Sequence, residues 1–199
     1  MVMSKAEKTR QFIIEKTAPI FNTKGYAATS LADITEATGL TKGSIYGNFE
    51  NKEEVVIEAL RYNVSKRSGG LDEVISASQN PLDALIGMLE YHREKLMQVL
   101  KTGGCPMLNA ATEADNHLDF LKNTVQRQFQ GWQMKFIKVI EDGQVQGYFK
   151  KDISADNYAK EFIMLIEGGI LLSGTLDDKK YMDLAIDRGL KIIETEIKI

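Results

Sequence analysis

Apolar residues recur three or four positions apart along almost the whole chain, the spacing that places them on one face of an α-helix. Segments in which apolar and polar residues alternate, as in a half-buried strand, are hard to find, and only three prolines occur. We therefore predict an all-α protein of about nine helices.

The first predicted helix carries signals at both ends. Ser4 and Glu7 have the spacing of a capping box, and Gly25 is placed to supply a left-handed C-terminal cap. Pro19 predicts a kink or an early end, because proline lacks the backbone donor and crowds the preceding turn. The expected apolar face of this helix consists of Phe12, Ile13, Ile20 and Phe21.

Three further helices are expected before the clearest composition break in the chain, Ser68-Gly69-Gly70. The second begins at Thr29 or Ser30 and ends at Gly39, and the third runs from Thr41 to about Asn48. The fourth is capped by Asn51 and continues to about Arg67. Beyond the break we predict helices at about 82–101, 106–115, 118–143, 154–175 and 178–198.

The second and third predicted helices, joined by a tight glycine turn, form a helix-turn-helix. Between Ala37 and Phe49 the only charged residue is Lys42, so no carboxylate repels phosphate there. Gly43 and Gly47 lack side chains and permit close approach of the backbone to a duplex. The side chains offered by the third helix are donors suited to phosphate oxygens or base edges: Thr41, Lys42, Ser44, Tyr46 and Asn48.

A set of spaced residues extends across this segment: Phe21, Gly25, Tyr26, Thr29, Ser30, Ile34, Gly39, Gly43, Ser44, Ile45, Tyr46, Phe49 and Lys52. The set closely resembles the DNA-binding domain of the TetR family of bacterial transcriptional regulators. A second segment, Gly103 to Ala111, looks like the start of the ligand domain in one subgroup of that family.

The resemblance implies a homodimer that binds a palindromic operator in double-stranded DNA and leaves it when a small-molecule inducer binds. It implies a helix-turn-helix domain at residues 1–50, a connecting helix at 51–67, and a ligand-binding and dimerisation domain at 68–199. By resemblance, Thr29, Lys42, Tyr46 and Lys52 contact the DNA backbone or position the third helix, and Ser44 reads a base. Family members often carry a bulky residue where this chain has Gly47, which puts one backbone contact in doubt.

A small-molecule site would need an apolar cavity with a few polar groups. The same residues at helical spacing are also typical of ordinary packing, so both interpretations stay open. The candidates are Met88, Tyr91, His92, Cys105, Met107, Asn109, Phe129, Trp132, Phe136 and Met164.

Cys105, just before Pro106, is the only cysteine. A position near a helix start can lower the pKa of a thiol, which favours reaction with electrophiles, and some relatives resembling this subgroup use a cysteine here for sensing. Release of the operator by modification of this cysteine is therefore an alternative to an inducer, and a buried, inert thiol is the other interpretation.

The last two predicted helices are the expected dimer surface, where two helices from each subunit form a four-helix bundle. The alternative is that both helices pack inside one protomer. The apolar stripes are Tyr158, Phe162, Leu165, Ile166, Gly169 and Ile170 in one helix, and Met182, Ile186, Leu190 and Ile193 in the other.

The charge balance at first argues against nucleic acid, since 28 acidic and 25 basic side chains give a net charge of −3. The charges are unevenly distributed, however. Residues 1–67 carry 10 basic and 8 acidic side chains, whereas residues 68–199 carry 15 and 20. We therefore expect a mildly basic DNA-binding unit joined to an acidic domain.

Other classes of protein find little support in the sequence. We expect a cytoplasmic protein, because the N-terminus lacks an apolar leader core and the longest apolar run, 162–172, is interrupted by Glu167. Glu113, Asp115 and His117 make at most a weak metal site, so we expect neither a metal nor a cofactor. No catalytic motif is present. The alternatives are an activator or partner-regulated DNA-binding protein of the same fold, and a small helical enzyme or carrier.

Overall fold

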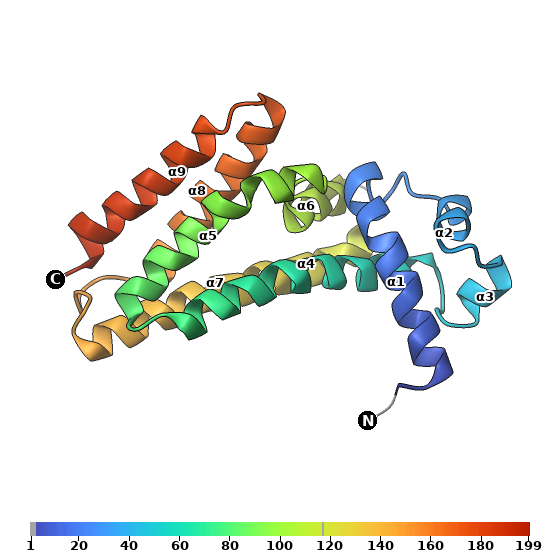
Figure 1. The fold of residues 1–199 in the computed structure, drawn as a ribbon, viewed down its shortest axis with the longest axis horizontal. Coiled ribbons are helices and arrows are strands. Elements are labelled where there is room, and N and C mark those ends of the chain that lie inside the picture. Colours follow the sequence, from blue (N-terminus) through green and yellow to red (C-terminus); the bar gives the residue numbers. More distant parts are fainter. Residues whose placement is uncertain (1–2, 117) are drawn as a thin grey trace. The chain divides into compact units, whose positions relative to one another are not determined.

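The computed structural model describes residues 3–116 and 118–199, and helices joined by short connections make up nearly all of the regular structure in these residues (Figure 1). The prediction of an all-α fold with about nine helices is confirmed. The only pairing of extended backbone in the described residues is an isolated bridge between Phe149 and Lys198. The helices are α1 (Lys5–Lys24), α2 (Leu31–Thr38), α3 (Lys42–Tyr46), α4 (Lys52–Ala77), α5 (Pro81–Lys101), α6 (Pro106–Asn116), α7 (Asp119–Gln146), α8 (Ala155–Thr175) and α9 (Lys180–Ile192), followed by a π-helical turn at Ile193–Ile197.

The chain divides into two compact units that do not follow the order of the sequence. The first unit contains the described residues up to Lys66 together with Pro106–Arg127. The second contains Arg67–Cys105 and Gln128–Ile199. Helix α6 therefore belongs to the same unit as α1, α2 and α3, although a long stretch of sequence separates them.

Helix α1 begins and ends at the residues that the capping signals indicate. Ser4 Oγ accepts a hydrogen bond from Glu7 N at 3.2 Å, and Glu7 Oε2 accepts one from Ser4 N at 2.6 Å. The early end at Pro19 is wrong, since the helix continues to Lys24. Packing on both sides of the proline accounts for this, because Ile13 and Phe21 are fully buried.

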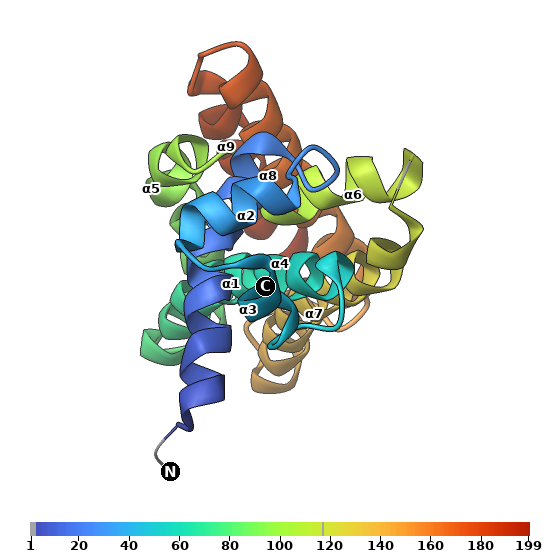
Figure 2. The same ribbon diagram turned by 90° about the vertical axis from the view of Figure 1, so that its right-hand side faces the viewer.

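The turns of the helix-turn-helix follow the sequence signals closely (Figure 2). The N-cap of α2 is Ser30, whose Oγ accepts from Asp33 N at 3.2 Å. Gly39 has φ 67° and ψ 12°, the left-handed conformation that favours glycine at a helix end. Thr41 caps α3, because its Oγ1 accepts from Ser44 N at 3.2 Å. Gly25 also has a positive φ, 101°, but its ψ of 151° is not left-handed helical.

The predicted end of the fourth helix near Arg67 is wrong, because α4 continues through Ser68-Gly69-Gly70 to Ala77. The two compact units nevertheless divide beside this segment, between Lys66 and Arg67. A Cβ at Gly70 would collide with the hydroxyl of Tyr91, so this glycine serves close packing of α5 on α4. The same hydroxyl donates to the carbonyl of Arg67 at 3.1 Å. The helix thus tolerates two glycines because a tertiary contact compensates for their low helix propensity.

Helices α8 and α9 lie side by side in the second unit (Figure 1). A Cβ at Gly169 would lie 3.1 Å from the sulfur of Met182, so the two helices approach closely at this point. The chain end is fixed by a hydrogen bond from Lys150 N to the carbonyl of Ile197 at 2.9 Å. None of the helices in the described part of the chain combines the length and the apolar character needed to cross a membrane.

Candidate nucleic-acid interface

Helix α3 presents one face to solvent and the other to the core of the first unit. Ile45 and, just beyond the helix, Phe49 are almost completely buried, and they anchor this segment. The side chains of Thr41, Lys42 and Tyr46 are exposed. Since buried and exposed positions alternate with the helical period, the exposed donors lie on the outer surface of the helix.

Tyr46 is 38% exposed and is therefore not a core residue. The Nζ of Lys42 lies 5.9 Å from the centroid of its ring, a weak cation–π contact. Ser44 is half-buried, and Gly43 is exposed. None of these four residues carries a carboxylate, and neither does any other residue of α3.

Two of the predicted DNA contacts, Asn48 and Lys52, are only partly exposed. The Nδ2 of Asn48 donates to the carbonyl of Ser44 at 2.9 Å, which stabilises the end of α3. Lys52, at the start of α4, is half-exposed. Both residues lie close in sequence to α3.

Thr29 is a correction to the sequence interpretation. Its side chain is fully buried, and its Oγ1 donates to the carbonyl of Gly25 at 2.6 Å. Its backbone N–H donates to the same carbonyl. The hydroxyl therefore stabilises the turn between α1 and α2 and is not placed to contact a phosphate. At this end of α2 the hydroxyl-bearing residue Ser30 is exposed.

Arg10, which the sequence interpretation missed, fixes the segment that follows α3. Its Nη1 donates to the carbonyl of Asn48 and its Nη2 to Glu54 Oε1, both at 2.7 Å. Its guanidinium lies 4.2 Å from the ring centroid of Phe49. A basic residue on α1 gives no local signal for this role, because its partners lie far along the chain.

Glu113 on α6 holds the loop between α1 and α2. Its two carboxylate oxygens accept hydrogen bonds from the backbone N–H groups of Tyr26 at 2.9 Å and Ala27 at 2.7 Å. One turn earlier on α6, Asn109 Nδ2 donates to the carbonyl of Asn22 at 3.3 Å. Helix α6 is thus bonded directly to the body that carries the helix-turn-helix.

These contacts replace the weak metal interpretation of Glu113. His117, which that interpretation needs, lies outside the described residues. No group of three metal-ligating side chains occurs among the residues that the structure does describe.

The inclusion of α6 also changes the charge of the unit that carries α3. Residues 1–66 and 106–127 together carry 11 basic and 11 acidic side chains. The mildly basic balance of residues 1–67 therefore does not describe the folded unit. Any attraction for DNA depends on the placement of individual groups such as Lys42.

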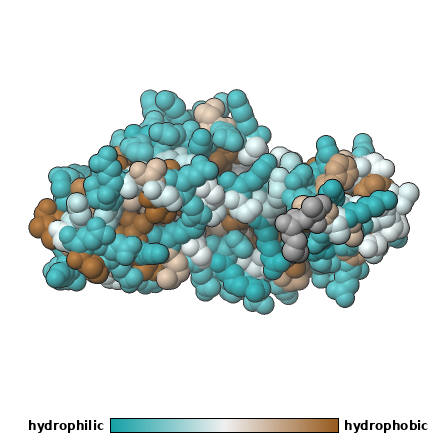
Figure 3. All heavy atoms as spheres, turned by 60° about the horizontal axis from the view of Figure 1, so that its bottom comes forward, coloured by the Kyte–Doolittle hydropathy of each residue, from teal (hydrophilic) through white to brown (hydrophobic). Residues whose placement is uncertain are grey.

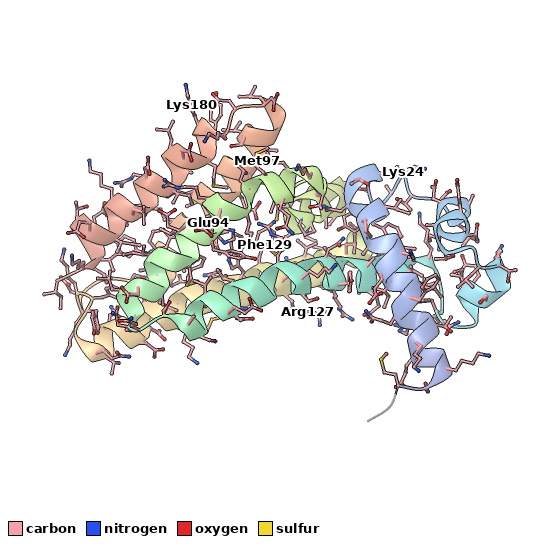
Figure 4. The ribbon with its side chains drawn as sticks, viewed as in Figure 1. Lys24, Glu94, Met97, Arg127, Phe129 and Lys180 are labelled. Carbon is pink, nitrogen blue, oxygen red and sulfur yellow. The ribbon has the colours of Figure 1, made fainter. Side chains whose placement is uncertain are left out.

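The ligand-binding candidates do not all lie in one unit. Met107 and Asn109 belong to the first unit, where Asn109 bonds to α1. Met164 is 67% exposed on the outer face of α8, so it is not part of an interior site in the second unit. In that unit Phe129 is half-buried on α7 (Figure 4). The remaining candidates belong to the second unit and are buried, with Tyr91 only partly so: Met88, Tyr91, His92, Cys105, Trp132 and Phe136.

Polar groups are buried among these aromatic rings. The His92 ring lies 5.2 Å from that of Trp132, centroid to centroid. Burial and the nearby charge of Arg67 lower the pKa of His92 to about 3, so its imidazole is neutral at neutral pH. Cys105 Sγ donates to Glu167 Oε1 at 2.9 Å, and burial raises the pKa of this glutamate. The available sequence signal for Glu167 was its position as the only charged residue in the apolar run 162–172.

The predicted dimer residues mostly form the core of a single protomer, as in the intramolecular alternative. Tyr158, Leu165 and Leu190 are half-buried. The other seven are buried against their own chain: Phe162, Ile166, Gly169, Ile170, Met182, Ile186 and Ile193.

The face of α8 and α9 away from that core carries other apolar residues, which we call the outer stripe. A Cβ at Gly168, on the same side of α8, would meet nothing within 4 Å. By contrast, the face drawn in Figure 3 is largely hydrophilic, with apolar areas broken up by polar side chains. The outer stripe consists of Met164, Leu171, Leu172, Leu176, Tyr181 and Leu184.

Comparisons with known proteins agree with this geometry. A family model described as "Bacterial regulatory proteins, tetR family" matches residues 13–59, and one described as "Tetracyclin repressor-like, C-terminal domain" matches residues 81–188. The HTH-type transcriptional repressor DhaR of Mycobacterium sp. (strain GP1) is 28% identical over 162 residues, which cover 81% of this chain and 80% of DhaR.

Solved structures are similar over the full length. A TetR-family transcriptional regulator from Cytophaga hutchinsonii has 36% identity and a TM-score of 0.91, covering 100% of this chain and 99% of its own. A TetR transcriptional regulator from Chloroflexus aurantiacus has 28% identity and a TM-score of 0.92, covering 99% and 100%. Since one family model alone spans more than half of the chain and another contains α2 and α3, this protein belongs to the TetR family and is a DNA-binding transcriptional regulator, not an enzyme.

Proposed function

We propose that this regulator is a homodimeric repressor that acts in the cytoplasm. Its two α3 helices bind the two halves of a palindromic operator, and a small molecule bound in the second unit releases it. For the α3 helices to enter successive major grooves, they must lie about 34–36 Å apart in the dimer. The proposed contact residues are Thr41, Lys42, Gly43, Ser44, Tyr46, Asn48 and Lys52.

The outer stripe is the main observation in support of a homodimer. Met164 and Leu184 are each 67% exposed, and large exposed apolar patches mark interaction sites in proteins that fold alone. Residues 164, 171 and 172 each lie three or four positions from Gly168, so all four share one face of α8. The open space at Gly168 favours close approach of a second helix. Pairing α8 and α9 of two protomers across a two-fold axis would bury both stripes in a four-helix bundle.

Repression is favoured by the relatives, since DhaR is named as a transcriptional repressor. Activation, or regulation by a partner protein, uses the same fold and the same DNA contacts. A reporter fused to the bound promoter separates these outcomes: deletion of the regulator raises expression if it represses and lowers expression if it activates.

Release by a small molecule is favoured over modification of Cys105. The thiol is only 1% exposed, and it donates a hydrogen bond to Glu167 inside the second unit. A reagent that attacks sulfur needs access to it. If the protein with Cys105→Ser is still released by the same compounds as wild type, the inducer route stands; loss of release by electrophiles alone would favour the cysteine route.

The test of the proposed function is selection of bound fragments from genomic DNA with the purified full-length protein. We expect a few enriched fragments that share an inverted repeat and bind less tightly as salt increases, because each neutralised phosphate releases counterions. Enrichment of no fragment, or of a site without two-fold symmetry, would contradict the proposal.

A further inference from the structure

Helix α3 is too short to hold its own position in the first unit. It spans five residues, Lys42–Tyr46, which is little more than one helical turn. A helix of this length is not stable alone in water, because the cost of nucleation exceeds what one turn of hydrogen bonds returns. The direction in which its donors point is therefore set by the residues that fix its two ends.

The beginning of α3 is fixed by a local contact, but its end is not. Thr41 caps the first turn by accepting from Ser44 N at 3.2 Å. Beyond the other end lies a segment that we call the α3–α4 turn, residues 47–51, which connects α3 to α4. Its first residue, Gly47, has no side chain with which to anchor the helix end. The contacts that hold this turn therefore come from elsewhere in the first unit.

Arg10 on α1 binds the α3–α4 turn. Its Nη1 donates to the carbonyl of Asn48 at 2.7 Å, and its guanidinium lies 4.2 Å from the ring centroid of Phe49. Asn48 is joined to α3 in turn, because its Nδ2 donates to the carbonyl of Ser44 at 2.9 Å. A continuous series of hydrogen bonds thus leads from α1 to the end of α3.

The other terminal nitrogen of Arg10 binds a carboxylate that holds the same turn. Nη2 of Arg10 donates to Glu54 Oε1 at 2.7 Å, and Glu54 Oε2 accepts from Glu50 N at 2.6 Å. The hydrogen bond from the backbone of Glu50, and after it the bond and charge of Arg10, lower the pKa of Glu54, so this carboxylate is ionised at neutral pH. Both oxygens of Glu54 are therefore used within the protein.

We propose that Arg10 and Glu54 are positioning residues for operator recognition, which orient α3 through the α3–α4 turn and do not themselves contact DNA. The proposal rests on the proposed function, in which α3 enters the major groove, and it adds the residues that set the position of this helix. Both terminal nitrogens of Arg10 are bonded to protein acceptors, and only a third of its side chain is exposed. Its place is thus fixed by the same contacts that fix the turn.

Removal of the Glu54 charge gives opposite results for a positioning role and for a phosphate contact. In Glu54→Gln an amide nitrogen replaces one oxygen, so either Arg10 or Glu50 N loses its acceptor. If Arg10 bound a phosphate, loss of the neighbouring carboxylate would strengthen DNA binding. For a positioning role we expect operator affinity to fall about five- to tenfold. The matched control Glu53→Gln removes the same charge at the exposed adjacent position and should bind at least as tightly as wild type.

Two substitutions of Arg10 separate its charge from its geometry. Arg10→Met removes every donor, whereas Arg10→Lys keeps the charge but lacks the planar fork that reaches two acceptors. We expect each to lower operator affinity about five- to tenfold. The matched control is Arg61→Met, which removes an exposed arginine paired with Glu58 within α4 at 2.7 Å, and its effect should be less than about twofold. Affinities are measured by fluorescence anisotropy with the fragment most enriched by the wild-type protein.

Hydrogen exchange tests the same contacts without DNA. In the free full-length protein, exchange of the amides of residues 43–50, followed by mass spectrometry, reports how often α3 and the α3–α4 turn open. We expect exchange in this segment to be at least about fivefold faster in Arg10→Met and Glu54→Gln, with wild-type rates in α2. The two controls should keep wild-type rates in both segments. Circular dichroism and melting temperature first establish that each variant is folded.

Three results would overturn the proposal. These are equal or tighter operator binding by folded Glu54→Gln protein, wild-type affinity in Arg10→Lys, and unchanged exchange of residues 43–50 in Arg10→Met. If Arg10→Met fails to fold, operator binding by Arg10→Lys and Glu54→Gln decides. A wild-type protein that selects no DNA loses the proposed function, whereas one that binds its operator as tightly as its Arg10 and Glu54 variants loses only this inference.

Discussion

Leu184 on the outer stripe offers the most direct test of the proposed dimer. Its side chain is 67% exposed in the protomer, and complete burial of a leucine contributes about 1.5–3 kcal/mol. The two-thirds that remains to be buried corresponds to about 1–2 kcal/mol in each protomer. Since two-fold symmetry counts the residue twice, Leu184→Glu should weaken the dimer by about 2–4 kcal/mol, before any cost of burying the new charge. The dimer dissociation constant would rise roughly 30- to 700-fold.

Sedimentation equilibrium over a range of protein concentrations measures this change. The matched control is Met97→Glu, which places a carboxylate at a methionine on α5 that is 57% exposed and lies outside the outer stripe (Figure 4). Melting temperatures of both variants establish that the protomer remains folded. An unchanged dissociation constant in a folded Leu184→Glu protein would refute the reasoning, as would an equal effect of Met97→Glu.

Three further predictions concern single charged or titratable groups. Lys42→Ala should weaken operator binding and reduce the magnitude of the slope of log K against log salt concentration by about 0.9, the contribution of one phosphate contact. Fluorescence anisotropy titrations at several salt concentrations measure this slope. A slope equal to that of wild type would remove Lys42 from the DNA contacts. Glu113→Gln leaves one of two backbone N–H groups without its acceptor and should lower the free energy of unfolding in urea by about 1–3 kcal/mol, and a change near zero would contradict the assigned role. Burial lowers the pKa of His92 to about 3, below its unfolded value of 6.5, so the unfolded chain binds the proton more readily. The free energy of unfolding should therefore fall as the pH decreases from 6.5 to about 3, by up to about 1.4 kcal/mol per pH unit. His92→Gln should remove this part of the loss. If the free energies of unfolding of wild type and His92→Gln change in parallel with pH, the buried neutral imidazole is not the cause.

The ends of the short helices could be read from the sequence because the physics there is local. Ser4, Ser30 and Thr41 each cap a helix through a backbone N–H three residues away, as the capping patterns predict. Gly39 adopts the left-handed conformation that its position requires. The same local signals gave the wrong end for α4. Gly70 packs against the ring of Tyr91 on α5, and no residue near Gly70 in the sequence indicates this contact.

The candidate site divides in the same way. The donors of α3 could be predicted because a single helix with the apolar anchor Ile45 exposes its other face. Arg10 and Glu113 could not, since their partners are 38 to 87 residues away in sequence. The burial of Thr29 likewise depends on the fold of the turn around Gly25.

What the sequence by itself determined about this protein is the all-α fold, the helix-turn-helix and its exposed donors, because each depends on periodicity and on contacts within a few residues. Only the tertiary structure decided which apolar face of α8 and α9 is internal. Both faces repeat with the helical period, and periodicity does not indicate whether the neighbour is the same chain or another. The tertiary structure also decided that α6 joins the unit of α3 and that Cys105 donates to Glu167, because packing brings together residues that are distant in the sequence.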